Sequence, residues 1–166
     1  MRRGTAAAGS ALFLIAAPGV VAGAIPWAIT GWRMEDSLFW GSRVLGGVLI
    51  AAGVAVVLHA FARFAIEGLG TPAPIAPTER LVVGGIYRHV RNPMYLAVGS
   101  AIAGQALLLG QTELLGYLLA FAALCLGFVH LYEEPTLRRQ FGAEYDAYRR
   151  SVPRWIPRLR PWSADR

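Results

Sequence analysis

Apolar and polar positions follow one another along this chain in long blocks. Four stretches contain no charged residue, and they lie between Arg3 and Arg33, Arg43 and Arg63, Arg91 and Glu113, and Glu113 and Glu133. Each holds at least 19 residues, about the length that a helix needs to cross the hydrocarbon core of a bilayer. The helices of a soluble bundle would each carry a polar stripe, which these stretches lack. The pattern predicts four transmembrane helices, near 10–31, 40–64, 94–110 and 113–132.

The connections between these helices differ in kind. Only Gly110-Gln111-Thr112 separates the third helix from the fourth, so the two must form a tight antiparallel hairpin. The connection between the second and third helices contains four prolines, Pro72, Pro74, Pro77 and Pro93. Because proline lacks the backbone donor that a helix interior needs, we expect an extended but ordered loop there.

A second periodic segment follows the fourth predicted helix. Apolar and aromatic side chains recur there at helical spacing, at Leu137, Phe141, Tyr145 and Tyr148. Pro135 suits the first turn of a helix, and Pro153 would end it. We predict an amphipathic helix that lies on the membrane face or on the loop that precedes Pro93.

Composition supports an all-α integral membrane protein of one domain. The chain has 166 residues, of which 55% are hydrophobic and 16% charged, and its mean hydropathy is +0.46. A soluble domain of ordinary composition is more polar. No Gly-x-Gly-x-x-Gly motif and no alternation of strands and helices is present, so we expect no Rossmann domain. Residues 1–66, with small residues at Gly46, Gly47 and Gly53, are interpreted as a helical hairpin scaffold that packs closely.

The basic residues are all arginine, and their distribution predicts the orientation. Fourteen of the 16 fall on one side of the predicted topology, and only Arg33 and Arg43 fall on the other. The positive-inside rule then places both termini and the 65–93 loop in the cytoplasm, and we expect a bacterial cytoplasmic membrane. The high isoelectric point, about 10.2, therefore requires no nucleic-acid partner and fits attraction to anionic lipid headgroups.

The first apolar segment has a second interpretation. Arg2-Arg3, the apolar run and Ala22-Gly23-Ala24 together resemble a cleavable secretory signal. The run continues to Trp32, which is longer than the core of such a signal, so retention is favoured. Both alternatives give the same orientation for the other helices.

The only cysteine, Cys125, lies in the fourth predicted helix. One cysteine excludes an intrachain disulfide and any zinc cluster built on cysteines. We expect no metal site, and we interpret Cys125 as a small hydrophobic residue.

Two adjacent acids, Glu133 and Glu134, close the fourth predicted helix. A carboxylate at that depth is costly unless it lies at the interface or has a partner. In one interpretation the pair caps the membrane boundary and the next helix, whose N-terminus favours negative charge. In the other, the pair holds a cation or the hydroxyl groups of a ligand.

The segment "YRHVRNPMY" (87–95) places Arg88, His89 and Arg91 at the start of the third helix. As a positive-inside anchor, the segment would explain its arginines. The predicted hairpin, however, returns Glu133 and Glu134 to the same membrane face. Opposite charges that converge on one pocket suit a zwitterionic ligand.

Three segments in this order, "GIYRHVRNPMY", "LYEEP" and "FGAEYDAYRRSVPRWIP", resemble a known family. This family comprises integral-membrane methyltransferases, among them isoprenylcysteine carboxyl methyltransferase and the phospholipid N-methyltransferases. The resemblance covers about half of the chain, roughly 68–157. It implies methyl transfer from S-adenosylmethionine, bound at the cytoplasmic face, to a lipophilic acceptor that enters from the bilayer.

The resemblance assigns roles to individual positions and makes residues 67–166 the cofactor-binding, catalytic part. The residues it implies at the cofactor are Gly68, Gly70, Leu81, Val82, Tyr87, Asn92, Pro93, Met94, Tyr95, Glu133 and Glu134. We expect Arg91 and Glu134 to be catalytic residues, with Arg91 orienting the reacting ends of cofactor or substrate. Glutamates suit the ammonium group and ribose hydroxyls of the cofactor, and an arginine suits its carboxylate.

This chain departs from the family pattern at two positions. The family usually has Arg-His-Pro where this chain has Arg91-Asn92-Pro93. Asn92 therefore replaces a histidine, and asparagine cannot titrate near neutral pH. Val129 stands where prenylcysteine methyltransferases carry an arginine for the substrate carboxylate. The second departure disfavours a prenylcysteine substrate, and the acceptor stays open between a lipid amine and a lipid carboxylate.

Three further alternatives are open at this point. His130 is either a general base or, as we favour, a residue that packs between helices, and His59 is a weaker candidate. An NADPH-dependent reductase of the sterol-reductase type would have a similar C-terminal hairpin and tail. A non-enzymatic scaffold would need only the basic surface, whose partners are membrane lipids. The oligomeric state is undetermined.

Overall fold

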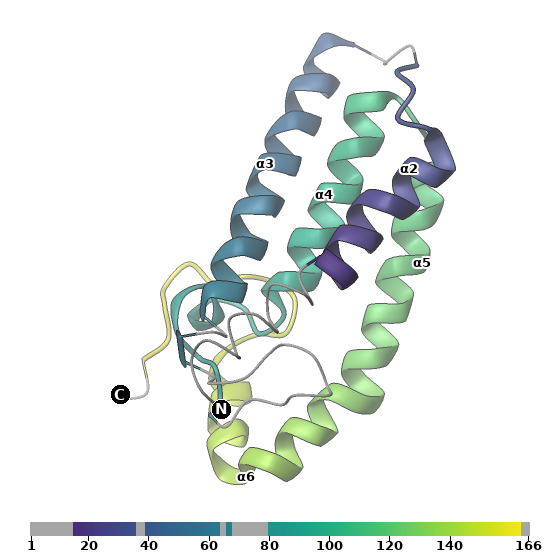
Figure 1. Ribbon diagram of the computed structural model, residues 1–166. Helices are drawn as coiled ribbons and strands as arrows, with labels where there is room; N and C mark the ends of the chain where they lie inside the picture. Colours follow the sequence, from purple (N-terminus) through teal and green to yellow (C-terminus); the bar gives the residue numbers. More distant parts are fainter. Residues whose placement is uncertain (1–14, 36–38, 64–65, 68–79, 164–166) are drawn as a thin grey trace.

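The computed structural model describes residues 15–35, 39–63, 66–67 and 80–163, and no strand occurs in these residues. The elements are η1 (Ile15–Ala24), α2 (Ile25–Thr30), α3 (Trp40–Arg63), η3 (Gly85–Arg88), α4 (Pro93–Leu109), α5 (Glu113–Phe128), η4 (Val129–Glu133) and α6 (Glu134–Ser151). Figure 1 shows the long helices side by side, with α6 and the C-terminal segment gathered at one end of the bundle. The predicted all-α class is confirmed for the described residues.

Four apolar helices correspond to the four predicted spans. Two are long and apolar enough to cross a membrane, Trp40–Arg63 and the continuous helix that begins at Glu113. The other two, Ala16–Thr30 and Pro93–Leu109, are apolar but shorter. The structure therefore supports two spans by length and composition, and the other two stay a prediction.

Helices α3 and α4 approach each other closely at glycines. A Cβ atom added to Gly46 would lie 2.5 Å from the Gly104 carbonyl oxygen, and one added to Gly53 would lie 2.6 Å from the Ala97 carbonyl oxygen. Gly47, by contrast, faces open space. The prediction of close packing thus holds for Gly46 and Gly53. The same contact contains a core of Val57, Phe61, Ala97, Val98 and Ile102.

The predicted hairpin between α4 and α5 is present. Gly110 ends α4 with φ at 74°, a left-handed conformation that glycine adopts without a steric penalty. The buried Gln111 side chain follows and donates to the Arg33 carbonyl oxygen at 3.0 Å. These contacts fix the turn against the connection between α2 and α3.

The amphipathic helix α6 lies on the residues that precede α4, as one of the two predicted placements required. Its buried face, Tyr145 and Tyr148, packs with Val152 against Leu81 and Val83. The Tyr148 hydroxyl donates to the Tyr87 carbonyl oxygen at 2.7 Å. The helix ends at Ser151, two residues before Pro153, as predicted.

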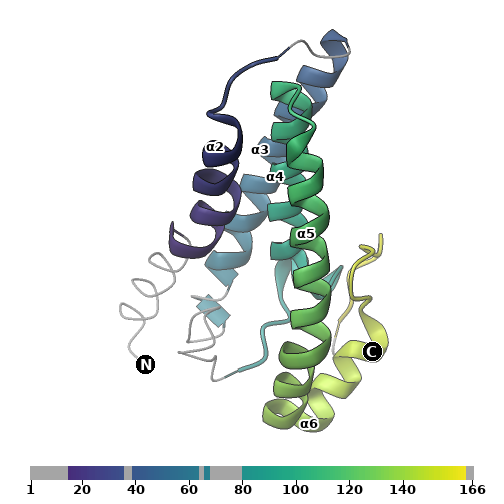
Figure 2. The same cartoon turned by 90° about the vertical axis from the view of Figure 1, so that its right-hand side faces the viewer.

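The predicted helix α6 is present, and it is kinked. Gly142 has φ 51° and ψ −121° and kinks the helix, a conformation that other residues adopt only with strain. Figure 2 shows α5 running into the first half of α6 and the second half turning back toward the bundle. The kink therefore brings residues 145–151 over the start of α4.

The segment after α6, residues 152–162, returns along the basic segment that precedes α4. Arg91 N–H donates to the Pro153 carbonyl oxygen at 3.0 Å, Arg158 N–H to that of His89 at 2.9 Å, and Trp162 N–H to that of Arg88 at 3.0 Å. We call residues 152–162 the C-terminal strap. The sequence did not predict this pairing.

Candidate functional site

The start of α4 is held in place by the C-terminal strap. Pro93 occupies the first turn of α4, and Asn92, which is buried, precedes it. The Asn92 side-chain amide donates to the Arg154 carbonyl oxygen at 3.2 Å. Asn92 thus positions the strap in this structure, and its predicted contact with a cofactor is untested.

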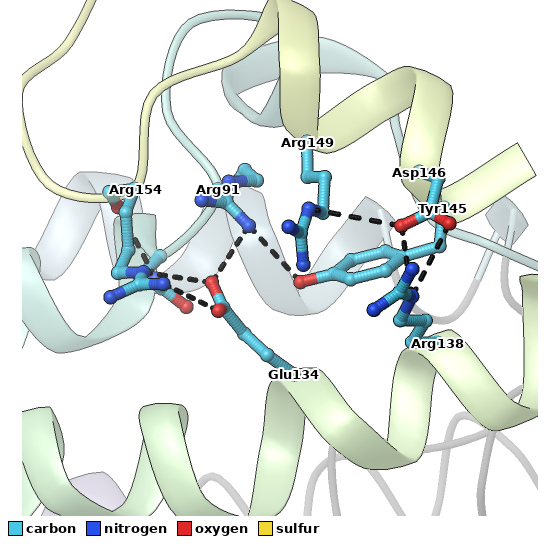
Figure 3. A network of polar contacts seen from close by, with 8 residues as sticks. Arg91, Glu134, Arg138, Tyr145, Asp146, Arg149 and Arg154 are labelled. Carbon is cyan, nitrogen blue, oxygen red and sulfur yellow. Dashed lines mark hydrogen bonds and ion pairs between the residues drawn. The ribbon is translucent and has the colours of Figure 1, made fainter.

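Glu134 lies between two arginines. Its Oε1 accepts from Arg91 Nη1 at 2.7 Å, and the Arg154 guanidinium donates to both carboxylate oxygens, at 2.8 Å and 2.5 Å. Arg91 Nη1 also donates to the Tyr145 hydroxyl at 3.1 Å. Figure 3 shows Glu134 below Arg91 and Arg154, with Tyr145 beyond Arg91. The carboxylate is buried and fully paired, so its first role is to join α4, α6 and the strap.

Glu133, the neighbouring acid, has very different surroundings. Its Oε2 accepts a hydrogen bond from the Tyr95 hydroxyl at 2.9 Å, and no arginine pairs with it among the described residues. Burial raises the pKa of Glu133 above its ordinary value; the hydrogen bond from Tyr95 opposes this, and the charge of Glu134 adds to it. Glu133 is therefore a desolvated acid whose ionised form lacks a cation.

Of the three basic side chains in 88–91, only Arg91 reaches the acid pair. Arg88 Nε donates to the Trp162 carbonyl oxygen, and the His89 ring Nδ1 lies 2.8 Å from the Arg158 carbonyl oxygen. Both side chains hold the strap. Arg91 is therefore the one of these three side chains that pairs with Glu134, and the contact of any of them with a cofactor is untested.

The remaining positions implied by the resemblance fall into three groups. Val82 and Tyr87 are buried in a small core with Ala60, against which Met94 packs. Leu81 packs instead on the tyrosines of α6. Gly68 and Gly70 lie outside the described residues. The structure thus gathers Val82, Tyr87 and Met94 near the start of α4, and it separates Leu81 from them.

The strap and α6 contribute residues to the site that were not predicted from the sequence. Arg154 and Tyr145 complete the contacts of Glu134 and Arg91, and Trp155 packs with its ring centroid 6.3 Å from that of Tyr95. The indole N–H of Trp155 and the Nε–H of Arg91 are buried and have no acceptor among the described residues. Two donors without acceptors beside a carboxylate without a cation form an incomplete set of contacts. We call Arg91, Tyr95, Glu133, Glu134, Tyr145, Arg154 and Trp155 the polar layer.

Two neighbouring residues of η4, Val129 and His130, differ in exposure. Val129 is buried, with 1% of its surface exposed, so its side chain packs in the interior. His130 is exposed and lines an open hollow. The prediction that His130 packs between helices was therefore wrong, because the helix turns that side chain outward.

Comparison with protein families gives one match. Residues 42–144 match the family model described as "Phospholipid methyltransferase", which is more than half of the chain. The chain belongs to the phospholipid methyltransferase family. Neither the curated proteins nor the solved structures gave a match.

Membership of the phospholipid methyltransferase family confirms the resemblance to membrane methyltransferases and implies methyl transfer. The matched range includes most of the polar layer, from Arg91 to Glu134. It ends at residue 144 and does not reach Arg154 or Trp155. In this family member, the strap thus adds contacts to the acid pair from beyond the matched region.

Proposed function

We propose that the protein transfers a methyl group from S-adenosylmethionine to a lipid acceptor, and that the acceptor is the headgroup amine of a phospholipid. The observation that carries the proposal is Glu133. A carboxylate that is largely removed from water and lacks a cation is costly. Glu133 is such a group, and it belongs to the same polar layer as two buried donors without acceptors, in a member of a membrane methyltransferase family. Such a set of contacts fits a ligand that carries both charges.

The polar layer suits the amino-acid and ribose portions of S-adenosylmethionine. Glu133 can accept from the cofactor's ammonium group or from its ribose hydroxyls. The buried donors on Arg91 and Trp155 can bind its carboxylate, since a hydrogen bond to a charged group is stronger than one between neutral groups. Glu134 is not available in the same way, because two arginines already neutralise it. We therefore assign Glu134 to the positioning of Arg91 rather than to ligand contact.

The chain's own contribution to catalysis is alignment. S-adenosylmethionine supplies an electrophilic methyl group, and transfer to nitrogen requires donor and acceptor to be in line. Fixing that geometry is worth several kcal/mol of the barrier, up to about 7–11 kcal/mol in well-oriented reactions. The buried pairs of Glu134 hold Arg91 rigidly at the start of α4. The strap covers this position and limits the access of water.

A lipid amine must lose a proton before its nitrogen can attack. An imidazole is the side chain suited to take up a proton near neutral pH. His130 is exposed at the rim of the hollow that Glu134 also lines. We assign its ring nitrogen the role of proton acceptor, either directly or through a water molecule.

Binding calorimetry of S-adenosylmethionine to the full chain in detergent tests the proposal. The wild type is expected to bind, and Glu133→Gln is expected to lose binding while the protein stays folded. Glu113→Gln, at the exposed start of α5 and the far end of the bundle, is the matched control and should bind as the wild type does. Binding of NADPH in place of S-adenosylmethionine would favour the reductase alternative. A folded wild type that binds neither would favour the scaffold.

A further inference from the structure

An open hollow of about 370 Å³ lies beside the first turn of α6, next to Glu134 of the polar layer. Its lining residues are His130, Glu134, Pro135, Arg138, Arg139 and Arg149. Figure 3 shows Arg138 reaching up from the first half of α6 and Arg149 reaching down from the second half. The kink at Gly142 therefore creates the hollow, because it folds one half of the helix over the other.

The hollow has an excess of positive charge. Arg138 and Arg149 share one carboxylate, that of Asp146, at 3.2 Å and 3.7 Å. Glu134, the other acid at the hollow, is neutralised by Arg91 and Arg154 on its far side. Arg139 is exposed and has no acid partner among the described residues. Three arginines at the hollow thus face one shared carboxylate, a balance that favours an anion.

The position of the hollow indicates where that anion comes from. Helix α5 and the following η4 expose large apolar side chains, with Leu119 and Leu124 of α5 at 72% and 73% and Leu131 of η4 at 77% exposed. Such a surface is suited to acyl chains rather than to water. It ends next to His130, where the hollow begins. A lipid that lies along α5 would bring its phosphate to the arginines.

We propose that this hollow binds the phosphodiester of a membrane phospholipid, and that this lipid is the methyl acceptor. Guanidinium groups bind phosphate oxygens through paired hydrogen bonds, and basic pockets at the membrane boundary are known to hold lipid headgroups. The identification of this lipid as the acceptor rests on the proposed function, whereas the phosphate site itself does not. In this arrangement the headgroup of the bound lipid lies in the hollow that His130 also lines.

Equilibrium binding of radiolabelled dihexanoyl-phosphatidylethanolamine to the full chain in detergent tests the site. Dihexanoylglycerol, which lacks the phosphate, is the control ligand. The double variant Arg138→Gln/Arg139→Gln removes two positive charges from the hollow. The matched control, Arg150→Gln/Arg160→Gln, removes two exposed arginines outside it. A further variant, Arg138→Lys/Arg139→Lys, retains the charge.

We expect the wild type to prefer the phospholipid over the diacylglycerol. One cation near an anionic lipid lowers the dissociation constant about fivefold. Loss of two cations should therefore make the double Gln variant bind the phospholipid on the order of 30-fold more weakly. The control Arg150→Gln/Arg160→Gln should bind the phospholipid as the wild type does. The variant Arg138→Lys/Arg139→Lys should retain most of the wild-type affinity. Unchanged phospholipid binding in the double Gln variant would overturn the proposal, as would equally tight binding of glycerol 3-phosphate, which would identify a site for free phosphate.

Calorimetry with S-adenosylmethionine on the same samples separates this inference from the proposed function. The double Gln variant should bind the cofactor as the wild type does. Loss of cofactor binding in that variant would assign the hollow to the cofactor and overturn the lipid site. A wild type that binds phospholipid through these arginines but does not bind S-adenosylmethionine would contradict the proposed function and leave the site standing.

Discussion

The α3–α4 contact and the polar layer, which lie next to each other, are built on opposite principles. The first consists of apolar side chains and glycines that bring two backbones together at Gly46 and Gly53. The second is joined by charged and polar side chains from α4, α6 and the strap, including Arg91, Glu134 and Arg154. Among the described residues, two donors of the polar layer lack acceptors and Glu133 lacks a cation, whereas the first contact is closely packed. This difference indicates that the bundle is the scaffold and that the polar layer binds the ligand.

Substitution of Gly46 should break the scaffold. In Gly46→Ala the new Cβ would meet backbone atoms of Gly104 and Leu108 at 2.5–2.6 Å. Because backbone cannot yield as a side chain does, we expect the free energy of unfolding to fall by at least about 2 kcal/mol. Gly47→Ala is the matched control, since nothing lies within 4 Å of its Cβ, and alanine favours the helix. Equal stability of the two variants in denaturant titrations would contradict the close contact.

Neutralising Glu134 should break the polar layer from within. Glu134→Gln leaves the buried Arg91 without its acid, and removing one partner of a buried ion pair costs about 3 kcal/mol or more. We expect a lower unfolding temperature and, because Arg91 is no longer positioned, loss of cofactor binding. Thermal unfolding followed by circular dichroism measures the first effect and calorimetry the second. Unchanged stability would show that the contacts with Arg91 and Arg154 contribute nothing.

The buried donor of Trp155 offers a more selective test of the same layer. Trp155→Phe removes the indole N–H but keeps an aromatic ring beside Tyr95. Loss of one hydrogen bond to a charged group weakens binding about tenfold. The affinity for S-adenosylmethionine should therefore fall by about that factor, without loss of stability. Trp162→Phe, whose ring packs on Tyr148, should bind normally. Identical affinities in both variants would remove Trp155 from the site.

The pH dependence of binding should follow Glu133. Its raised pKa means that it takes up a proton at a higher pH than an ordinary glutamate. As the pH falls through this raised value, the negative charge is lost and cofactor binding should be lost with it, while Glu133→Gln should not bind at any pH. The stability of the folded state depends on pH in the opposite direction to cofactor affinity. Between the ordinary and the raised pKa the folded state holds the proton more tightly, so rising pH lowers the free energy of unfolding.

Much of the fold could be predicted from the sequence because its signals are local. Long uncharged stretches indicated the apolar helices, Gly110-Gln111-Thr112 indicated the hairpin, and Pro135 and Pro153 lie close to the two ends of α6. The close α3–α4 packing also followed from small residues, although the sequence could not tell Gly46 from Gly47. The two glycines differ in the direction in which a Cβ atom would point, toward α4 or into open space, and composition does not show this direction.

The rest depends on contacts between residues that are distant in sequence. Glu134 pairs with Arg91, 43 residues earlier, and with Arg154, 20 residues later, and no periodic pattern marks such pairs. The strap and the exposure of His130 were missed for the same reason. The kink in α6 had a signal, since Gly142 interrupts a helical pattern, but the regular spacing of the aromatic residues outweighed it. Glu133 and Glu134 were predicted to act together, but in the structure Glu134 pairs with two arginines and Glu133 contacts Tyr95.

Thermal unfolding of Glu133→Gln and Glu134→Gln, each with and without S-adenosylmethionine, tests this division most directly. Glu134→Gln should unfold at a clearly lower temperature than the wild type, because it breaks buried ion pairs. Glu133→Gln should unfold at the wild-type temperature or above it, because it removes a desolvated charge. The cofactor should raise the unfolding temperature of the wild type but not that of Glu133→Gln. Equal destabilisation by the two substitutions, or full stabilisation of Glu133→Gln by the cofactor, would contradict the account.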